Sequence, residues 1–174
     1  PCYIVAEIGI NHSGSLSLAK KLIDAAVEAG VNAVKFQKRN LESLYQKKIL
    51  ENPTLDSQGT EILIDVLNEV EFNEKDFGQI IDYCKERKIT FLCTPWDIPS
   101  VDLLEKFNVS AFKIASADLT NFPLLRYISK IGKPMIISTG MSELDEIEKT
   151  VNFVKNEQVP FILLHCNSTY PSSI

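Results

Sequence analysis

The chain has 174 residues, 45% hydrophobic and 24% charged, a balance typical of a globular protein with a sizeable core. Its formal net charge of −5 argues against a general nucleic-acid partner. No apolar run reaches the ~18 residues of a membrane span, and the first residues lack the basic segment of a secretory signal. The four cysteines are widely spaced. We therefore expect a cytoplasmic protein with neither a membrane nor a nucleic-acid partner.

Six short apolar runs, each ending in polar residues, alternate with amphipathic segments along the chain. The first run covers residues 3–8. Each of the others lies at the end of a segment that begins with the last residues of an expected helix: 28–36, 85–94, 106–116, 130–139 and 156–166. The last four recur every ~20 to 27 residues, which is the spacing of a repeated βα unit. Strands that alternate with helices predict a parallel sheet with right-handed crossovers.

Several expected helices have recognisable faces or ends. One face of the first helix would gather five apolar residues, Leu18, Leu22, Ala25, Ala26 and Ala29. Gly30 would end that helix in a left-handed conformation, and Asn73 would cap the helix that precedes the third strand. Ser142 followed by Asp145 resembles a capping box at the start of the last helix.

The two faces of the expected strands differ in the size of their residues. On one face the residues are small or polar: Val5, Glu7 and Gly9, then Ala33, Lys35 and Gln37, then Ala111, Lys113 and Ala115. The other face is bulky, as in Val34 and Phe36. A doubly wound sheet needs bulky residues on both faces, so this pattern favours an α/β fold of the (β/α)8 TIM barrel type. Eight strands close such a barrel, so residues 1–174 would form roughly its first six βα units.

A long connection, residues 38–72, separates the second and third expected strands and contains a predicted helix over residues 61–70. At the catalytic end of a barrel such a segment would be either a lid or a surface ornament. It begins with the basic pair Lys38 and Arg39, which could bind a phosphate on a substrate. The alternative is a solvated pair that balances Glu42 or Glu51.

Polar side chains lie at or just after the end of every expected strand and would converge on the mouth of the barrel. They are Glu7, Asn11 and His12; Lys35, Gln37, Lys38 and Arg39; Thr94 and Asp97; Lys113, Ser116 and Asp118; Ser138 and Thr139; and His165, Asn167, Ser168 and Tyr170. Two lysines with hydroxyls and helix N-termini would suit a phosphate and a carboxylate, and Glu7 could orient a hydroxylated substrate or exchange protons with it.

Each of these assignments has a structural alternative. Either lysine could form a buried ion pair with Glu7. The hydroxyls of Ser116, Ser138 and Thr139 could cap helices. His165 would be a satisfied core histidine and His12 would cap its loop, while Cys93 and Cys166 would pack as small hydrophobes. With two histidines and no carboxylate cluster, we expect no complete metal site within these residues.

Five motifs in order resemble the sialic acid synthase family, with its legionaminate and pseudaminate synthase relatives. They are residues 4–12 (IVAEIGINH), 34–37 (VKFQ), 112–118 (FKIASAD), 137–141 (ISTGM) and 164–171 (LHCNSTYP). The resemblance implies a condensation of phosphoenolpyruvate with an N-acetylmannosamine-type aldose, or its 6-phosphate. The product would be a nine-carbon 2-keto sugar acid plus phosphate. It also implies a cytoplasmic homodimer and a divalent metal, Mn or Mg, whose ligands would lie on later strands.

The resemblance also implies roles for individual residues. Glu7, Lys113 and Asp118 would be catalytic, and Lys35, Gln37, Thr94, Ser116, Ser138, Ser168 and Tyr170 would bind substrate. Two alternatives stay open. One is another phosphoenolpyruvate-using or Schiff-base aldolase barrel, with Lys113 or Lys35 as the imine-forming lysine. The other is a non-catalytic sugar-phosphate-binding homologue. We expect residues 1–174 by themselves to be inactive and prone to associate.

Overall fold

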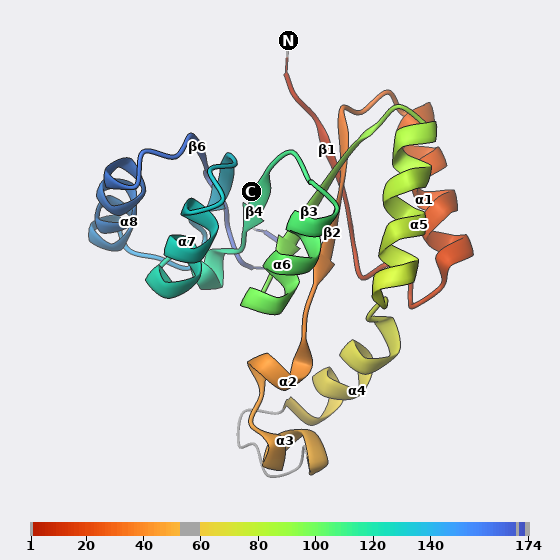
Figure 1. Ribbon diagram of the computed structural model, residues 1–174, viewed down its shortest axis with the longest axis horizontal. Helices are drawn as coiled ribbons and strands as arrows, with labels where there is room; N and C mark the ends of the chain where they lie inside the picture. The colour runs from red at the N-terminus through yellow and green to blue at the C-terminus, as the bar shows by residue number, and fades with distance from the viewer. Residues whose placement is uncertain (1, 53–59, 170, 173–174) are drawn as a thin grey trace.

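The structure, a computed structural model, describes residues 2–52, 60–169 and 171–172. Six strands in this part of the chain form one parallel sheet in sequence order. They are β1 (Val5–Gly9), β2 (Ala33–Lys38), β3 (Thr90–Pro95), β4 (Phe112–Ile114), β5 (Met135–Ser138) and β6 (Phe161–Leu164) (Figure 1). The six predicted strands and their parallel pairing are thus confirmed.

Helices connect successive strands. They are α1 (Leu16–Glu28), α5 (Glu74–Glu86), α6 (Ile98–Lys106), α7 (Phe122–Ser129) and α8 (Leu144–Asn156), with a short 3₁₀ helix, η2 (Ser116–Asp118), after β4. The long connection after β2 holds α2 (Leu41–Leu44), α3 (Lys47–Glu51) and α4 (Thr60–Val70). These three lie together beyond the carboxyl end of β2 (Figure 1). The predicted helix over 61–70 is α4, and no helix in the described ranges is long and apolar enough to cross a membrane.

The two faces of the sheet differ as predicted. Val34, Phe36, Phe112 and Ile114 belong to the main core, which also contains helix residues such as Ile80. The opposite face carries a separate small cluster of Ala33, Leu92 and Ala111, with Ile136 packed against it. A doubly wound sheet would reverse its strand order and bury bulky residues on both faces, so that architecture does not describe this sheet.

Two local predictions were wrong in part or by one position. Of the predicted face of α1, Ala26 is buried and Leu22 packs against the core, but Leu18 is 37% exposed, and the other buried residues are Ala19 and Ile23. In α8 the capping box is formed by Glu143 and Glu146 rather than by Ser142 and Asp145. In both helices neighbouring positions offer similar residue types, so the sequence alone does not fix the register.

Two other local predictions are confirmed. Gly30 has a φ of +72° directly after the end of α1, a conformation that glycine adopts without a steric penalty. The side chain of Asn73 caps α5 by accepting a hydrogen bond from the backbone N–H of Asp76 at 3.0 Å. Helix ends of this kind depend on nearby residues, which explains why the sequence predicts them well.

Candidate active site

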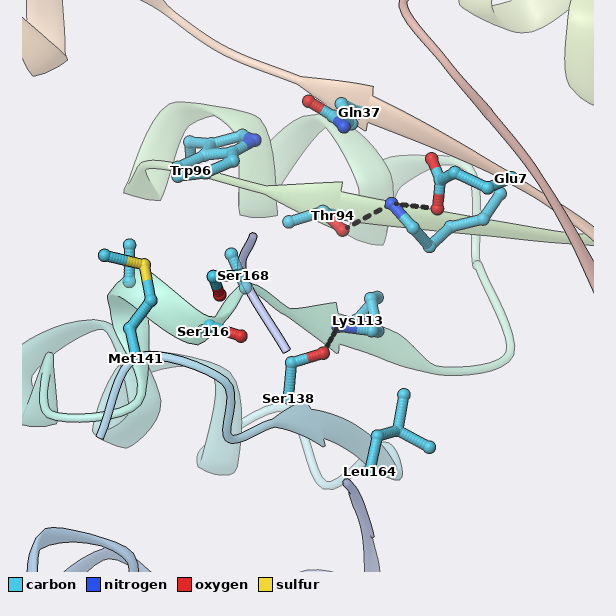
Figure 2. Close-up of a pocket in the computed structure, with 13 residues that line it drawn as sticks. Glu7, Gln37, Thr94, Trp96, Lys113, Ser116, Ser138, Met141, Leu164 and Ser168 are labelled. Atoms are coloured by element: carbon cyan, nitrogen blue, oxygen red, sulfur yellow. Dashed lines mark hydrogen bonds and ion pairs between the residues drawn. The ribbon is translucent and has the colours of Figure 1, made fainter. Parts of the chain in front are cut away.

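A cavity of about 520 Å³ lies at the carboxyl ends of the strands, a size common for small-molecule sites. The predicted residues that line it are Glu7, Lys35, Gln37, Thr94, Lys113, Ser116, Ser138 and Ser168 (Figure 2). Asp118 does not line it, and Tyr170 lies outside the described residues. Parallel strands explain this convergence, because every strand presents its carboxyl end at the same edge of the sheet.

Lys35 on β2 faces its neighbour β1, where the parallel register pairs it with Glu7. Its Nζ lies 3.0 Å from Glu7 Oε2 and donates a hydrogen bond to Thr94 Oγ1, also at 3.0 Å. The ion pair considered as an alternative is therefore present. However, the Glu7 side chain is 52% exposed, so the pair opens into the cavity rather than being sealed in the core.

Lys113 on β4 has a different environment. Its Nζ donates to Ser138 Oγ at 2.5 Å and to the carbonyl of Ile114 at 2.7 Å, and it forms no salt bridge with any described residue. Burial, followed by the positive charge of Lys35, lowers the pKa of Lys113 to about 8. The buried ammonium group therefore favours an anionic ligand that would supply the missing negative charge.

The hydroxyls around Lys113 are not helix caps, contrary to the alternative interpretation. Ser116 Oγ accepts a hydrogen bond from the Gly140 backbone N–H at 3.0 Å, and Thr139 Oγ1 donates to the carbonyl of Leu164 at 2.9 Å. A Cβ atom at Gly140 would lie only 2.8 Å from Ser168 Oγ. These contacts hold the loops after β4, β5 and β6 together around the cavity.

The basic pair after β2 is engaged within the protein. Glu71, which follows α4, accepts a hydrogen bond from Lys38 Nζ at 2.8 Å and lies 3.8 Å from Arg39 Nη1. Both basic side chains are nearly buried, at 13% and 11% exposed. The prediction that Glu42 or Glu51 would balance this pair was wrong, because the fold places Glu71 next to the end of β2.

The sequence interpretation missed Trp96, whose side chain lines the cavity directly after β3. The guanidinium carbon of Arg39 lies 4.5 Å from the centre of its ring, and Arg39 also donates to Gln37 Oε1 at 2.5 Å. The available signal was position alone, since Trp96 lies two positions after Thr94, the polar end of a predicted strand.

Asp118 is buried in η2, beside the cavity wall rather than in it. Its Oδ1 accepts a hydrogen bond from Asn121 Nδ2 at 3.0 Å, while Oδ2 is buried without a hydrogen-bond partner. Burial raises the pKa of this carboxyl group. Its catalytic role stays a prediction.

The two histidines differ from each other. Gly14 N–H donates to His12 Nδ1 at 3.2 Å and the His12 ring stacks on Phe72, so the loop-capping interpretation is confirmed. Burial lowers the pKa of His12. His165 is exposed at the end of β6, so its assignment as a core histidine was wrong.

The cysteines follow the predicted pattern only in part. Cys93 is fully buried, and burial raises the pKa of its thiol, as expected for a small hydrophobic residue. Cys166 is only partly buried, and its Sγ lies 3.3 Å from Ser138 Oγ at the cavity wall.

The described residues do not fit a divalent metal. Within the ranges 2–52, 60–169 and 171–172, no group of three or more His, Cys, Asp or Glu side chains has a metal-binding arrangement. Glu7 is the only carboxylate among the described residues that line the cavity, and its Oε2 already pairs with Lys35. A single carboxylate does not supply the ligand set that such an ion requires.

Comparison with known proteins gives consistent matches. The model of the NeuB family matches residues 22–174. The N,N'-diacetyllegionaminic acid synthase of Campylobacter jejuni is 38% identical over 97% of this chain and 52% of its own length. The human N-acetylneuraminate-9-phosphate synthase is 37% identical over 98% of this chain and 48% of its own length.

A solved structure agrees with these sequence matches. The N-acetylneuraminic acid synthetase of Leptospira borgpetersenii, crystallised in complex with citrate, is 36% identical with a TM-score of 0.88. The alignment covers 99% of this chain and 56% of that protein. The chain spans about half the length of the curated relatives it matches. Since the family model and these relatives each cover most of the 174 residues, the chain belongs to the NeuB family.

Proposed function

We propose that the protein condenses phosphoenolpyruvate with an open-chain N-acetylmannosamine-type aldose. C3 of phosphoenolpyruvate attacks the aldehyde carbon, and the aldehyde oxygen takes up a proton to become a hydroxyl. Water then adds at C2, and the tetrahedral intermediate collapses with cleavage of the C–O bond to phosphate. The products are a nine-carbon 2-keto sugar acid and inorganic phosphate, so one water is consumed in each turnover.

The observation that carries this proposal is the pair of lysines in one cavity. Lys35 and Lys113 are each only 8% exposed, and both line the cavity together with hydroxyl groups. Phosphoenolpyruvate carries a phosphate and a carboxylate, so it needs two cationic contacts with additional donors. Thr94 and Ser138, which already contact the two ammonium groups, and Ser116 complete this binding set.

The aldose would occupy the side of the cavity nearest β1 and β2. The Glu7 carboxylate is half exposed there, and Gln37 lies beside it (Figure 2). Glu7 can accept a hydrogen bond from a sugar hydroxyl or exchange a proton with the aldehyde oxygen, because its carboxylate lines the cavity. We include Ser168, Asp118 and Tyr170 in the sugar site on the basis of the family resemblance.

We also propose that the six βα units belong to a (β/α)8 barrel. An apolar hollow of about 370 Å³ adjoins the site on the face without helices, and its lining includes Val5 and Ile162. These two side chains are 38% and 60% exposed. Apolar surface of this kind is normally covered, and closure of a barrel would cover it. We further propose that the full-length protein is a cytoplasmic homodimer. Light scattering, which measures molar mass, would test the dimer.

The metal dependence implied by the family would require ligands beyond the described residues. None of the steps assigned to Glu7 or the lysines depends on a metal. We propose that Mn or Mg is nevertheless required for turnover of the full-length protein. Loss of activity with EDTA and its recovery with either ion would support this proposal, and full activity after exhaustive chelation would contradict it.

The experiment that tests the function is product formation by the full-length protein. It should be supplied with phosphoenolpyruvate and either N-acetylmannosamine, its 6-phosphate or a 2,4-diacetamido hexose. In water labelled with ¹⁸O, the label should enter C2 of the sugar acid and not the phosphate. Binding of phosphoenolpyruvate without product from any acceptor would instead favour a non-catalytic sugar-phosphate-binding homologue.

One observation favours a second candidate, a Schiff-base aldolase. The pKa of Lys113 is lowered to about 8, which would leave part of this amine neutral and nucleophilic near neutral pH. Borohydride would then trap a covalent adduct on Lys113 in the presence of a keto-acid substrate. We expect no adduct, because Ser138 Oγ and the carbonyl oxygen of Ile114 both accept hydrogen bonds from Lys113 Nζ and stabilise its ammonium form.

A further inference from the structure

We propose that Arg39 is a positioning residue that fixes the carboxamide of Gln37 with its NH₂ group toward the cavity. Beside this NH₂ group, the site would select a ligand atom that accepts a hydrogen bond. The identity of that ligand as the aldose rests on the proposed function. The fixed orientation of Gln37 does not, because it follows from contacts within the chain.

The orientation of Gln37 is determined by the chemistry of its partner. Arg39 Nη2 lies 2.5 Å from Gln37 Oε1, and a guanidinium group has donors but no acceptor. The contact is therefore satisfied only when the amide oxygen faces Arg39. The NH₂ group then points away, toward β1, where a Cβ atom built on Gly9 would lie 3.4 Å from Gln37 Nε2 and 3.1 Å from Glu7 Oε1.

Arg39 is itself held from two other directions. Glu71 Oε1 lies 3.8 Å from Nη1, and the ring of Trp96 lies against the guanidinium plane at 4.5 Å. Burial lowers the pKa of Arg39, while the charge of Glu71 opposes that shift and keeps the group cationic. Arg39 thus connects Glu71, near the end of the long connection after β2, to two residues that line the cavity, Gln37 and Trp96.

Lys38 provides a matched control within the same cluster. It also contacts Glu71, with Nζ 2.8 Å from Oε2, but no described contact joins it to Gln37 or Trp96. Removal of either cation weakens the attachment of Glu71 to the end of β2. Only removal of Arg39 leaves the Gln37 amide free to rotate and to present its oxygen to the cavity.

The first test observes the amide directly and does not depend on activity. In the full-length protein labelled with ¹⁵N-glutamine, the Gln37 side-chain signals are those that disappear in Gln37→Met. We expect them to be dispersed and slow to exchange in the wild type and in Lys38→Met, and to move to solvent-like positions in Arg39→Met. Gln37 signals that are the same in Arg39→Met as in Lys38→Met would overturn the proposal.

The second test separates substrate binding from the fold. Arg39→Met should raise KM for the aldose about tenfold while KM for phosphoenolpyruvate stays within about twofold, since Arg39 does not contact the lysines. In a Gln37→Met background the same substitution should have no further effect. An equal change in Lys38→Met, or additive effects with Gln37→Met, would overturn the proposal. If the wild type forms no product, the proposed function fails, and the amide signals alone decide the role of Arg39.

Discussion

The two sides of the cavity differ in how their charges are balanced. On the β1–β2 side, Lys35 is paired with Glu7, and Lys38 and Arg39 share Glu71. On the β4–β5 side, Lys113 contacts only a hydroxyl and a carbonyl among the described residues. On the first side each of these cations contacts a carboxylate, although the three cations and two carboxylates sum to a formal charge of +1. On the second side Lys113 is a buried positive charge without a counter-ion among the described residues.

This difference suits an anionic group of phosphoenolpyruvate at Lys113 and the proposed aldose beside Glu7 and Gln37. A buried cation without a partner costs free energy that an anionic ligand recovers on binding, so the β4–β5 side suits an anionic group of phosphoenolpyruvate. A neutral polyhydroxy aldehyde gains little from an uncompensated charge and more from oriented donors and acceptors. Glu7 and Gln37 supply those groups on the β1–β2 side.

The largest effect is expected from Lys113→Met. Loss of a charge-assisted contact worth about 1.5–3 kcal/mol should weaken binding of phosphoenolpyruvate at least about tenfold. Lys35→Met should also weaken binding of phosphoenolpyruvate at least about tenfold. The Glu7 carboxylate that loses its partner in this variant is half exposed, so water can solvate it. Calorimetric titration and thermal unfolding would measure binding and stability. Normal binding combined with early melting would show that the lysine serves only the fold.

The second prediction concerns pH. Because the pKa of Lys113 is lowered to about 8, affinity for phosphoenolpyruvate should fall as pH rises through 8, and binding above this pH should take up a proton. The free energy of unfolding should change in the opposite direction to the affinity as pH rises. Between about 8 and the ordinary value of 10.5 the unfolded chain binds more protons, so the contribution of Lys113 to stability increases with pH.

Titration calorimetry in two buffers of different ionisation enthalpy would measure the proton uptake. Urea unfolding at pH 7 and pH 10, compared with Lys113→Met, would measure the effect on stability. An affinity that stays constant across pH 7 to 10 would mean that Lys113 is not the group that binds the anion.

A smaller effect should separate the two hydroxyls that contact the lysines. Ser138→Ala removes the only side-chain acceptor that Lys113 has among the described residues, and a lost hydrogen bond of about 1 kcal/mol corresponds to about fivefold in affinity. Thr94→Val removes one contact of Lys35 but leaves Glu7 in place, so a change below about twofold is expected. Equal effects of the two substitutions on phosphoenolpyruvate binding would remove the distinction between the sides.

The smallest effect is expected from Lys38→Ala on the choice of acceptor. Lys38 is already paired with Glu71, so it should not bind a phosphate on the sugar. The ratio of kcat/KM values for N-acetylmannosamine 6-phosphate and N-acetylmannosamine should stay within about twofold of the wild type. A selective loss of activity with the phosphorylated sugar would show that Lys38 leaves Glu71 when substrate binds.

Local signals and chain order predicted much of this structure. Strand ends, the two unlike strand faces, the Asn73 cap and the α4 helix follow from residues that are close in sequence. The helix faces were less secure, because one position of slip in α1 replaces Leu18 with Ala19 at the core. The exposure of His165 was not predictable either, since it depends on the position of β6 at an edge of the sheet.

The sequence alone determined that parallel strands would bring Glu7, Lys35 and Lys113 to one edge, because alternation and chain order are encoded locally. The tertiary structure decided how their charges are compensated. Glu7 and Lys35 are 28 positions apart and Arg39 and Glu71 are 32 apart, and only the fold brings these pairs into contact. Counter-ion choice depends on distances of a few ångströms between remote segments, and no local pattern in a single chain specifies them.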